Sequence, residues 1–305
     1  MRILLTGTNG QVGGALLPLL GSQNGEGQGS VLAPNREAFD LSRPETLGET
    51  LDALRPDLIV NPAAYTAVDR AEDERELAFR VNAEAPAAMA QWAARRGVPM
   101  VHVSTDYVFD GSGSEPWRED SAPDPLSVYG ASKLAGDRAI IAAGPAHLIV
   151  RTSWVYAARG SNFLNTMIRL ATEREELRVV ADQFGAPTSA RVIAETIAGV
   201  LGAAGGDPDR LFSERGGILN VACGGETSWH GFATAIVDTM RSRGVALKCE
   251  RIVPISTAEF PTKARRPANS RLSLQRLGQL FGCATPFWDE ALRPECLAIS
   301  SQTER

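Results

Sequence analysis

Residues 2–13 read Arg-Ile-Leu-Leu-Thr-Gly-Thr-Asn-Gly-Gln-Val-Gly, and this stretch decides the fold. The apolar run at residues 2–6 predicts a short β-strand, and an apolar helical pattern follows from Gln11 to Leu20. Glycines at every third position of the turn let the backbone bend tightly and approach a pyrophosphate at the helix N-terminus. A tight turn without a ligand is the alternative. We predict a dinucleotide-binding turn made of Gly7, Gly10, Gln11, Val12 and Gly13.

Apolar strand patterns alternate with helical patterns over most of the chain, which indicates a parallel sheet with helices on its faces. The further expected strands are Val31–Ala33, Leu58–Val60, Met100–Ser104, Leu148–Thr152 and Arg178–Ala181. The expected helices are Gln11–Leu20, Pro44–Leu54, Val68–Arg96, Ser127–Ala143, Asn162–Glu173 and Ala190–Leu201. The predicted fold class is α/β, a Rossmann-like doubly wound parallel sheet with a smaller C-terminal α/β substrate lobe.

Two glycine-rich breaks help to divide the chain. Residues 21–29 are expected to form an exposed loop, and residues 203–208 precede a region with less regular alternation. We expect residues 1–160 to be mainly an NAD(P)-binding Rossmann domain. Residues 161–305 are expected to be mainly the substrate-binding lobe, with segments at about 181–205 returning to the Rossmann domain.

Composition limits the classes of partner. The 305 residues are 44% hydrophobic, which is enough for one large core and a smaller lobe. A net charge of −5 and a pI near 5.4 do not favour binding to nucleic acid or to an anionic membrane. The four cysteines lack C-x-x-C spacing, and no segment approaches the roughly 18 uninterrupted apolar residues of a membrane span. We expect a cytoplasmic protein without membrane or nucleic-acid partners.

Tyr129 and Lys133 lie four residues apart in the stretch Tyr-Gly-Ala-Ser-Lys, inside an expected helix. Residues at this spacing share a helix face, so the Lys133 ammonium group is expected to lower the pKa of the Tyr129 phenol. A phenol activated in this way can transfer a proton near neutral pH, which is the chemistry of a carbonyl reductase. A solvent-exposed helix face is the alternative interpretation.

Seven motifs, in order, resemble the extended short-chain dehydrogenase/reductase superfamily and, within it, the dTDP-4-dehydrorhamnose reductase family. The resemblance runs nearly end to end. The Gly-Gln-Val-Gly turn, Asp-Gln-Phe-Gly-Ala-Pro-Thr and Arg-Pro-Ala-Asn-Ser are its narrower signals. The matching segments are residues 7–13, 60–69, 104–111, 129–136, 151–156, 182–188 and 266–272.

The resemblance implies a reaction. Members of this family reduce the C4 keto group of a dTDP-linked 6-deoxy sugar, dTDP-4-dehydro-β-L-rhamnose, with hydride from a reduced nicotinamide. In this sequence Tyr129 would supply the proton, Lys133 would hold the nicotinamide ribose, and the Thr105 hydroxyl would bind the same carbonyl oxygen. Asp106 would bind a sugar hydroxyl, with a helix cap as its alternative role.

Cofactor contacts are expected at the ends of further strands. Arg36 follows the second strand, where NAD-specific proteins place an acidic residue against the ribose 2′-hydroxyl. An arginine suits a 2′-phosphate and favours NADPH, although NADH stays possible. The resemblance places five further residues at the cofactor, namely Asp40 and Leu41 beside the adenine and Ala63, Ala64 and Tyr65 beneath the dinucleotide.

Candidate substrate contacts follow the catalytic motif. The aromatic ring of Trp154 can pack on a sugar or a base, and Arg266 is the expected diphosphate clamp. The other candidates are Asn162, Phe163, Gln183, Asn269 and Ser270. Each of these polar residues has a structural alternative, which is to stabilise the lobe.

Metal binding is not expected. The three histidines are far apart in the sequence and lack metal-ligand spacing. Some members of the family join subunits through Mg²⁺ held by glutamates, and this chain has Ala15 and Arg191 in the corresponding places. An arginine repels a cation, so a Mg²⁺-bridged dimer is not expected, and the chain can be a monomer or a homodimer.

Three other functions are alternatives to this reductase. Related 4,6-dehydratases have an acidic residue where this chain has Tyr107, so the base that removes the C5 proton is absent. A reductase or epimerase acting on another nucleotide sugar remains open. A regulatory subunit that resembles the beta subunit of methionine adenosyltransferase is the non-enzymatic alternative, although the catalytic residues argue against it.

Overall fold

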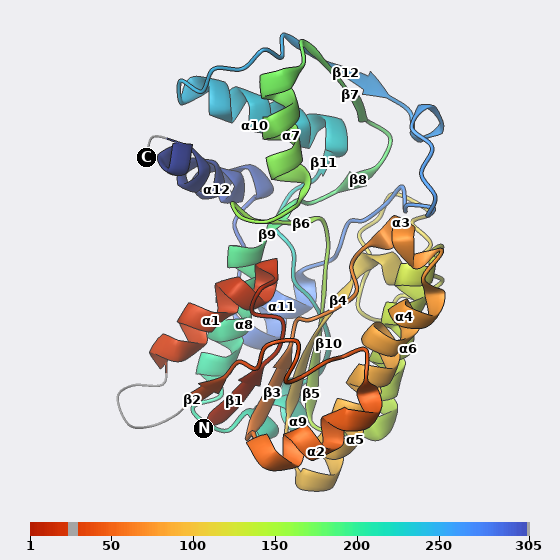
Figure 1. Cartoon of the computed structure of the whole chain (residues 1–305), viewed down its shortest axis with the longest axis vertical. Coiled ribbons are helices and arrows are strands. Elements are labelled where there is room, and N and C mark those ends of the chain that lie inside the picture. The colour runs from red at the N-terminus through yellow and green to blue at the C-terminus, as the bar shows by residue number, and fades with distance from the viewer. Residues whose placement is uncertain (24–29, 304–305) are drawn as a thin grey trace.

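The computed structural model describes residues 1–23 and 30–303. A six-stranded, fully parallel sheet lies in the lower part of the molecule as drawn in Figure 1. The strand order is β10–β5–β4–β3–β1–β2. The strands are β1 (Arg2–Leu5), β2 (Ser30–Leu32), β3 (Leu58–Asn61), β4 (Met100–Thr105), β5 (His147–Thr152) and β10 (Gly217–Asn220).

The order of the strands creates a switch point beside β1. From β1 the chain crosses to β2 on one side, and it then returns to β3 on the other. In open parallel sheets, ligands bind outside the carboxyl ends of the strands at such a point. The Rossmann-like parallel sheet predicted from the sequence is confirmed.

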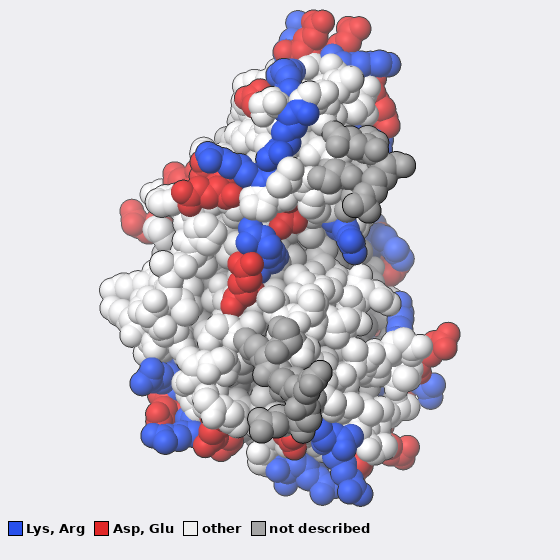
Figure 2. All heavy atoms as spheres, turned by 90° about the vertical axis from the view of Figure 1, so that its left-hand side faces the viewer, with Lys and Arg blue, Asp and Glu red and all other residues white. Residues whose placement is uncertain are grey.

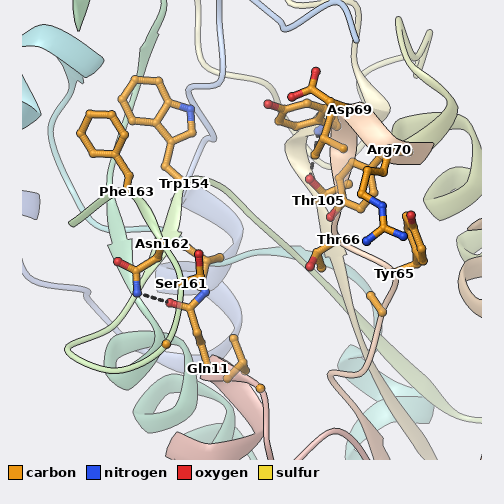
Figure 3. A pocket seen from close by; sticks show the side chains of 18 of the residues that line it. Gln11, Tyr65, Thr66, Asp69, Arg70, Thr105, Trp154, Ser161, Asn162 and Phe163 are labelled. Atoms are coloured by element: carbon orange, nitrogen blue, oxygen red, sulfur yellow. Dashed lines mark hydrogen bonds between the residues drawn. The ribbon is translucent and has the colours of Figure 1, made fainter. Parts of the chain in front are cut away.

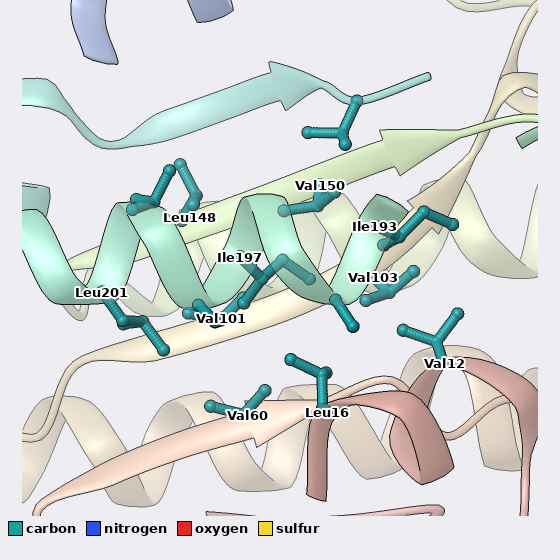
Figure 4. Close-up of a cluster of buried hydrophobic side chains, with 14 of the residues drawn as sticks. Val12, Leu16, Val60, Val101, Val103, Leu148, Val150, Ile193, Ile197 and Leu201 are labelled. Carbon is teal, nitrogen blue, oxygen red and sulfur yellow. The ribbon is translucent and has the colours of Figure 1, made fainter. Parts of the chain in front are cut away.

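Two helices cover one face of the sheet. These are α1 (Gln11–Gln23) and α8 (Ala190–Ala203). Figure 4 shows α8 lying over the strands, with Ile193, Ile197 and Leu201 directed toward strand valines such as Val101 and Val150. Because β-branched side chains fill the pleated surface well, this layer is fully buried.

The opposite face carries α2 (Pro44–Leu54), α5 (Ala85–Arg96) and α6 (Val128–Ala143). Its core includes Met89 and Trp92 from α5 packed against β-strand residues such as Ile59. Alanine is frequent in α5, so this helix lies close to both α2 and α6. The sheet is thus a buried layer between two layers of helices.

The smaller lobe lies above the sheet in Figure 1 and has its own core around Phe232, Leu177 and Leu292. Its elements are α7 (Phe163–Glu173), β7 (Glu176–Val180), α10 (Trp229–Ser242), β12 (Arg251–Ile255), η3 (Thr257–Glu259) and α12 (Trp288–Thr303). Short pairs of strands connect it to the sheet domain, namely β6 (Val155–Tyr156) with β9 (Thr188–Ser189) and β8 (Phe184–Gly185) with β11 (Thr227–Ser228). Two further helices, α9 (Pro208–Arg215) and α11 (Gln275–Phe281), return to the sheet domain.

The strand expected at 178–181 does not join the main sheet. It forms β7, which pairs in parallel with β12 in the lobe. The sixth strand of the main sheet is β10, which the sequence pattern did not reveal. Only Ile218 and Leu219 are apolar there, and a run of two residues gives no measurable period.

The single helix expected from Val68 to Arg96 is wrong. The chain instead forms α3 (Val68–Ala71), α4 (Arg75–Phe79), a π-helical turn η1 (Arg80–Glu84) and α5. The acidic residues between them are used by tertiary contacts, which a periodic pattern cannot reveal. The Glu72 carboxylate, for example, accepts a hydrogen bond from the Val128 amide of 2.9 Å.

The glycine-rich loop expected at residues 21–29 lies mostly outside the described residues. Helix α1 extends beyond its predicted end and includes Gly21. The helix expected at Ser127 begins one residue later, because the Ser127 side chain caps it by accepting a hydrogen bond from the Gly130 amide.

Positively and negatively charged side chains are interspersed on the surface. On the face in Figure 2, acidic and basic side chains lie next to each other at several places, and broad areas carry neither. Within residues 1–23 and 30–303, no helix is long and apolar enough to cross a membrane.

Gly136 is a sharp test of the packing between α6 and η1. A Cβ atom at this position would lie 2.1 Å from the Asn82 carbonyl oxygen, so Gly136→Ala is expected to destabilise the fold by about 3 kcal/mol. Gly199→Ala in α8 is the matched control, since a Cβ there has open space. The control is expected to be stabilising by up to about 1 kcal/mol. Urea unfolding of both variants measures this difference, and equal stabilities would contradict the packing described here.

Candidate active site

One large cleft of 1850 Å³ lies between the carboxyl ends of the sheet and the lobe. Figure 3 shows its two walls, with Trp154 and Phe163 on one side and Tyr65 and Arg70 on the other. Most of the residues predicted for the cofactor and the substrate line this cleft. The sequence placed them far apart, and the parallel sheet brings them to one edge.

The glycine turn forms the floor of the cleft at the end of β1. Gly7 adopts φ +62°, a conformation that favours glycine, and its carbonyl accepts a hydrogen bond from the Gly10 amide. A Cβ atom on Gly13 would lie only 2.2 Å from the Gly7 carbonyl oxygen. Helix α1 can therefore start directly against the strand, with its N-terminus directed into the cleft.

Helix α6 carries Tyr129 and Lys133 into the cleft from the other face of the sheet. Its first turn is fixed by Ser127 and by the carboxylate of Glu72, which both accept hydrogen bonds from free backbone amides. Gly130 allows this turn to approach closely, since a Cβ there would lie 2.1 Å from the Tyr107 carbonyl oxygen.

Tyr129 is half-buried beside the end of β4. Burial raises the pKa of its phenol above the ordinary value, the Thr105 hydroxyl opposes this effect, and Asp106 and Asp137 add to it. The phenol is therefore protonated at neutral pH and can act as an acid. Burial also raises the pKa of Asp106 to about 6, against the effects of nearby Ser270 and Thr105.

The contacts of Lys133 differ from those expected for its predicted role toward Tyr129. Its Nζ atom lies 2.9 Å from Nε2 of His102 and donates a 2.7 Å hydrogen bond to the Val103 carbonyl. Burial lowers the pKa of Lys133 to about 8, and Asp137 opposes this shift. The expectation that Lys133 lowers the pKa of Tyr129 is thus not met here, because burial dominates the phenol and His102 holds the lysine.

The predicted cofactor residues all line the cleft. Arg36 is 81% exposed at its side chain, and its Nε lies 3.8 Å from the Asp40 carboxylate. Asp40 also accepts hydrogen bonds from the amide and hydroxyl of Ser42, which fix the loop that contains Leu41. Because it is exposed, the Arg36 guanidinium group is accessible to a phosphate of a bound ligand.

Tyr65 is held by a buried asparagine. The Asn82 side chain accepts a hydrogen bond from the Tyr65 amide and donates to the Tyr65 carbonyl and the Ser132 hydroxyl. Asn82 lies in the π-helical turn η1, a feature that is frequent at functional sites. It therefore ties the loop containing Ala63, Ala64 and Tyr65 to the helix that carries Lys133.

Aromatic residues of the lobe form the far wall. Trp154 adopts φ +49°, which is strained for a bulky residue, and its ring stacks on Trp229 with 3.7 Å between centroids. Phe163 packs against Trp229 as well. Asn162 caps α7 and donates a 3.0 Å hydrogen bond to Gln11, which joins the lobe to the first helix (Figure 3).

The remaining substrate candidates have structural partners. Gln183 lines the cleft, but its amide donates to Thr257 and accepts from Trp229. Asn269 and Ser270 do not line it, and Asn269 donates to two backbone carbonyls. Arg266 lines the cleft and forms a bidentate pair with Asp69, at 2.7 and 3.1 Å.

Three groups in or beside this cleft were missed by the sequence analysis. Asp69 has no predicted role in the site, yet it pairs with Arg266. Trp229 and His102 have no local motif around them, so spacing gave no signal for either residue. Only the tertiary structure brings them against Trp154 and Lys133.

Arg191 is engaged by carboxylates. It forms ion pairs with Glu195 at 3.1 Å and Glu295 at 3.4 Å. Within the described part of the chain, no group of three or more acidic, histidine or cysteine side chains is arranged to hold a metal ion.

A Rossmann fold whose cleft contains a helical tyrosine and lysine beside a strand-end threonine defines the extended short-chain dehydrogenase/reductase class. Comparison with known proteins narrows this class. The family model for the RmlD substrate binding domain matches residues 1–300. The chain belongs to this family, that of the dTDP-4-dehydrorhamnose reductases.

Similar proteins cover nearly the whole chain. A dTDP-4-dehydrorhamnose reductase of Burkholderia thailandensis is 48% identical over 96% of this chain and 97% of its own length. The crystal structure of a Clostridium acetobutylicum dTDP-4-dehydrorhamnose reductase has a TM-score of 0.88 at 33% identity, over 98% of this chain and all of that chain. A Bacillus anthracis dTDP-4-dehydrorhamnose reductase in complex with NADP has a TM-score of 0.85 at 34% identity, over 97% and 99%. The resemblance predicted from the sequence is confirmed.

The raised pKa of Asp106 predicts a pH-dependent effect on stability. An aspartate whose pKa rises from 3.8 to about 6 on folding binds its proton more tightly in the folded state. The free energy of unfolding therefore falls as the pH rises through this window, by about 3 kcal/mol in total. Asp106→Asn removes this loss, so the variant is expected to be more stable than the wild type above about pH 6 and similar to it near about pH 4. Urea unfolding across this range tests it, and a difference that does not change with pH would contradict it.

Proposed function

We propose that this chain catalyses the reduction of the C4 keto group of dTDP-4-dehydro-β-L-rhamnose to dTDP-L-rhamnose with NADPH. The observation that carries the proposal is the half-buried, protonated phenol of Tyr129 beside Thr105, in the same cleft that the glycine turn lines. Full-length similarity to reductases named for this substrate supports the choice of sugar.

The residues at the sheet edge fit the dinucleotide. Gly7 and Gly13 leave the floor of the cleft without side chains, and the N-terminus of α1 supplies backbone amides for a pyrophosphate. The exposed guanidinium of Arg36 is placed for a 2′-phosphate. A bound NADPH would supply the hydride. The NADP complex of the Bacillus anthracis relative supports this cofactor.

The chain's own residues would handle the proton. Tyr129 donates its phenolic proton to the developing alkoxide, which is a stronger base than a phenolate, so a raised phenol pKa does not prevent the transfer. The Thr105 hydroxyl donates a hydrogen bond to the same oxygen. Lys133 binds the nicotinamide ribose through its ammonium group.

Cofactor binding and sugar binding are assigned to different parts of the chain. Residues 1–160 would mainly hold the cofactor, and residues 161–305 would mainly hold the dTDP-sugar, with the segment at about 181–205 belonging to the Rossmann domain. The packing of α8 on α1 supports the last assignment. All four cysteines lie in the described part and are free, which supports a reducing compartment, the cytoplasm.

Tyr129→Phe tests the reaction and its acid together. With dTDP-4-dehydro-β-L-rhamnose and NADPH, followed by loss of nicotinamide absorbance, kcat is expected to fall by about 10²–10⁴-fold while NADPH binding persists. Tyr156→Phe is the matched control. Its hydroxyl is buried in the lobe without a hydrogen-bond partner among the described residues, so its loss is expected to leave kcat unchanged.

Turnover retained by Tyr129→Phe would contradict the assignment of the acid. If the folded wild type binds NADPH but reduces only UDP- or GDP-linked 4-keto sugars, the proposed substrate is wrong and the proposed ketone reduction stands. Absence of turnover with every sugar would overturn the enzymatic proposal and favour a regulatory role.

Arg36→Ala tests the cofactor preference. Loss of a charge-assisted contact to the 2′-phosphate is expected to raise the KM for NADPH by about tenfold and to leave the KM for NADH unchanged. Arg138→Ala, at an exposed position of α6, is the matched control for removal of one positive charge. An equal rise in KM for both cofactors would contradict contact with the 2′-phosphate.

A further inference from the structure

A chain of buried polar side chains runs beneath the cleft across three neighbouring strands and into α6. The Thr6 hydroxyl donates a 2.6 Å hydrogen bond to Asn61, and the Asn61 amide lies 3.0 Å from Nδ1 of His102. Nε2 of His102 lies 2.9 Å from Nζ of Lys133. Asn61 and His102 are neighbours in the parallel register of β3 and β4, so the sheet itself sets their contact. Every member of the chain is nearly or fully buried.

Donor and acceptor counts show that this chain can respond to the charge of Lys133. A neutral imidazole has one N–H donor and one acceptor nitrogen. An ammonium group only donates, so Nε2 of His102 must then accept, and Nδ1 must donate to the oxygen of Asn61. When the lysine is uncharged, Nε2 of His102 can donate to Nζ, and Nδ1 then accepts a hydrogen bond from the Asn61 nitrogen. In the structure the Asn61 oxygen faces Thr6 and its nitrogen faces His102, which is the second arrangement. A half-turn of the Asn61 amide gives the first arrangement, in which the Asn61 nitrogen donates to the Thr6 hydroxyl.

The imidazole itself stays neutral. Burial lowers the pKa of His102 well below its ordinary value, and the Lys133 charge lowers it further. The other ionisable groups around Lys133 come from several elements. Asp137 on α6 pairs with Arg151 of β5 at 3.4 Å, while Tyr129 and Asp106 lie toward the cleft. A change in protonation near neutral to alkaline pH therefore belongs to Lys133, whose pKa is about 8.

We propose that His102, oriented by Asn61, is a positioning residue that holds the charged form of Lys133 for binding of the nicotinamide ribose. His102 touches neither cofactor nor sugar and acts through Lys133. The inference rests on the NADPH-dependent function proposed above and adds two residues to it, neither of which lines the cleft.

Binding of NADPH as a function of pH tests the inference without any sugar. Fluorescence titration of the wild type is expected to give a Kd that rises as the pH passes about 8, because Lys133 loses its proton there. In His102→Leu the ammonium loses one charge-assisted acceptor, so this rise is expected about one pH unit lower. At about pH 8 the variant should bind about fivefold more weakly, and at about pH 6 it should match the wild type.

Three further variants separate positioning from a structural role. His102→Gln keeps an acceptor facing Lys133 and is expected to restore the wild-type profile. The Asn61 side chain does not contact Lys133. Asn61→Ala is nevertheless expected to shift the pH profile of the NADPH Kd in the same direction as His102→Leu, because the imidazole tautomer is no longer held. His147→Leu is the matched control, since the His147 side chain contacts the Pro145 carbonyl and takes no part in the hydrogen bonds from Thr6 to Lys133.

The outcomes are distinct. A His102→Leu profile that coincides with the wild type would overturn the inference and leave the proposed function intact. A loss of affinity that is equal at all pH values would also overturn it, because it would indicate a general packing defect. If His102→Leu does not fold, His102→Gln and Asn61→Ala decide, and coincident profiles for these two would overturn the inference. A wild type that does not bind NADPH would overturn the proposed function and this inference with it.

Discussion

The close contact between the backbones of Gly7 and Gly13 is the constraint on which the rest of the site depends. A side chain at Gly13 would overlap the Gly7 carbonyl, so only glycine lets α1 begin directly at the end of β1. That start places free amides at the switch point of the sheet, where the strand order reverses and the cleft opens. Arg36, Tyr65, Thr105 and Tyr129 reach the same cleft because parallel strands end at one common edge.

A second theme is the use of buried polar groups to fix geometry. Asn82 ties the loop of Tyr65 to α6, and Asn61 ties β1 to His102 and so to Lys133. Burial of a polar group costs free energy unless the group is hydrogen-bonded. Each of these side chains can therefore adopt only the few conformations that keep its hydrogen bonds. The catalytic helix is therefore positioned by hydrogen bonds from two sides as well as by apolar packing. Such support matters for a reaction in which small displacements of the proton donor are costly.

The lobe supplies a different kind of surface. Trp154 stacks on Trp229, and the tilted ring of Phe163 packs against Trp229. Trp154 and Phe163 lie on the wall of the cleft opposite Tyr65 (Figure 3). The strained backbone of Trp154 is compensated by this stacking and by the close approach of Gly185. The Asp69–Arg266 pair and the Gln11–Asn162 hydrogen bond join the lobe to the sheet domain on either side. Arg266 would have to exchange a carboxylate for a phosphate if it is to clamp a diphosphate.

The sequence alone determined the class of fold, the glycine turn, the Tyr129–Lys133 pair and the family, because these depend on local spacing and on motifs that lie in order along the chain. It did not reveal the break in the helix expected from Val68 to Arg96, the membership of β10 in the sheet, or the partners of Arg266, Gln183 and Lys133. Those features depend on contacts between residues that are far apart in sequence, such as Asp69 with Arg266 and His102 with Lys133. A pattern with a period of two or 3.6 residues reports only which face of an element is apolar. Which buried polar group meets which partner is decided by the packing of the whole chain.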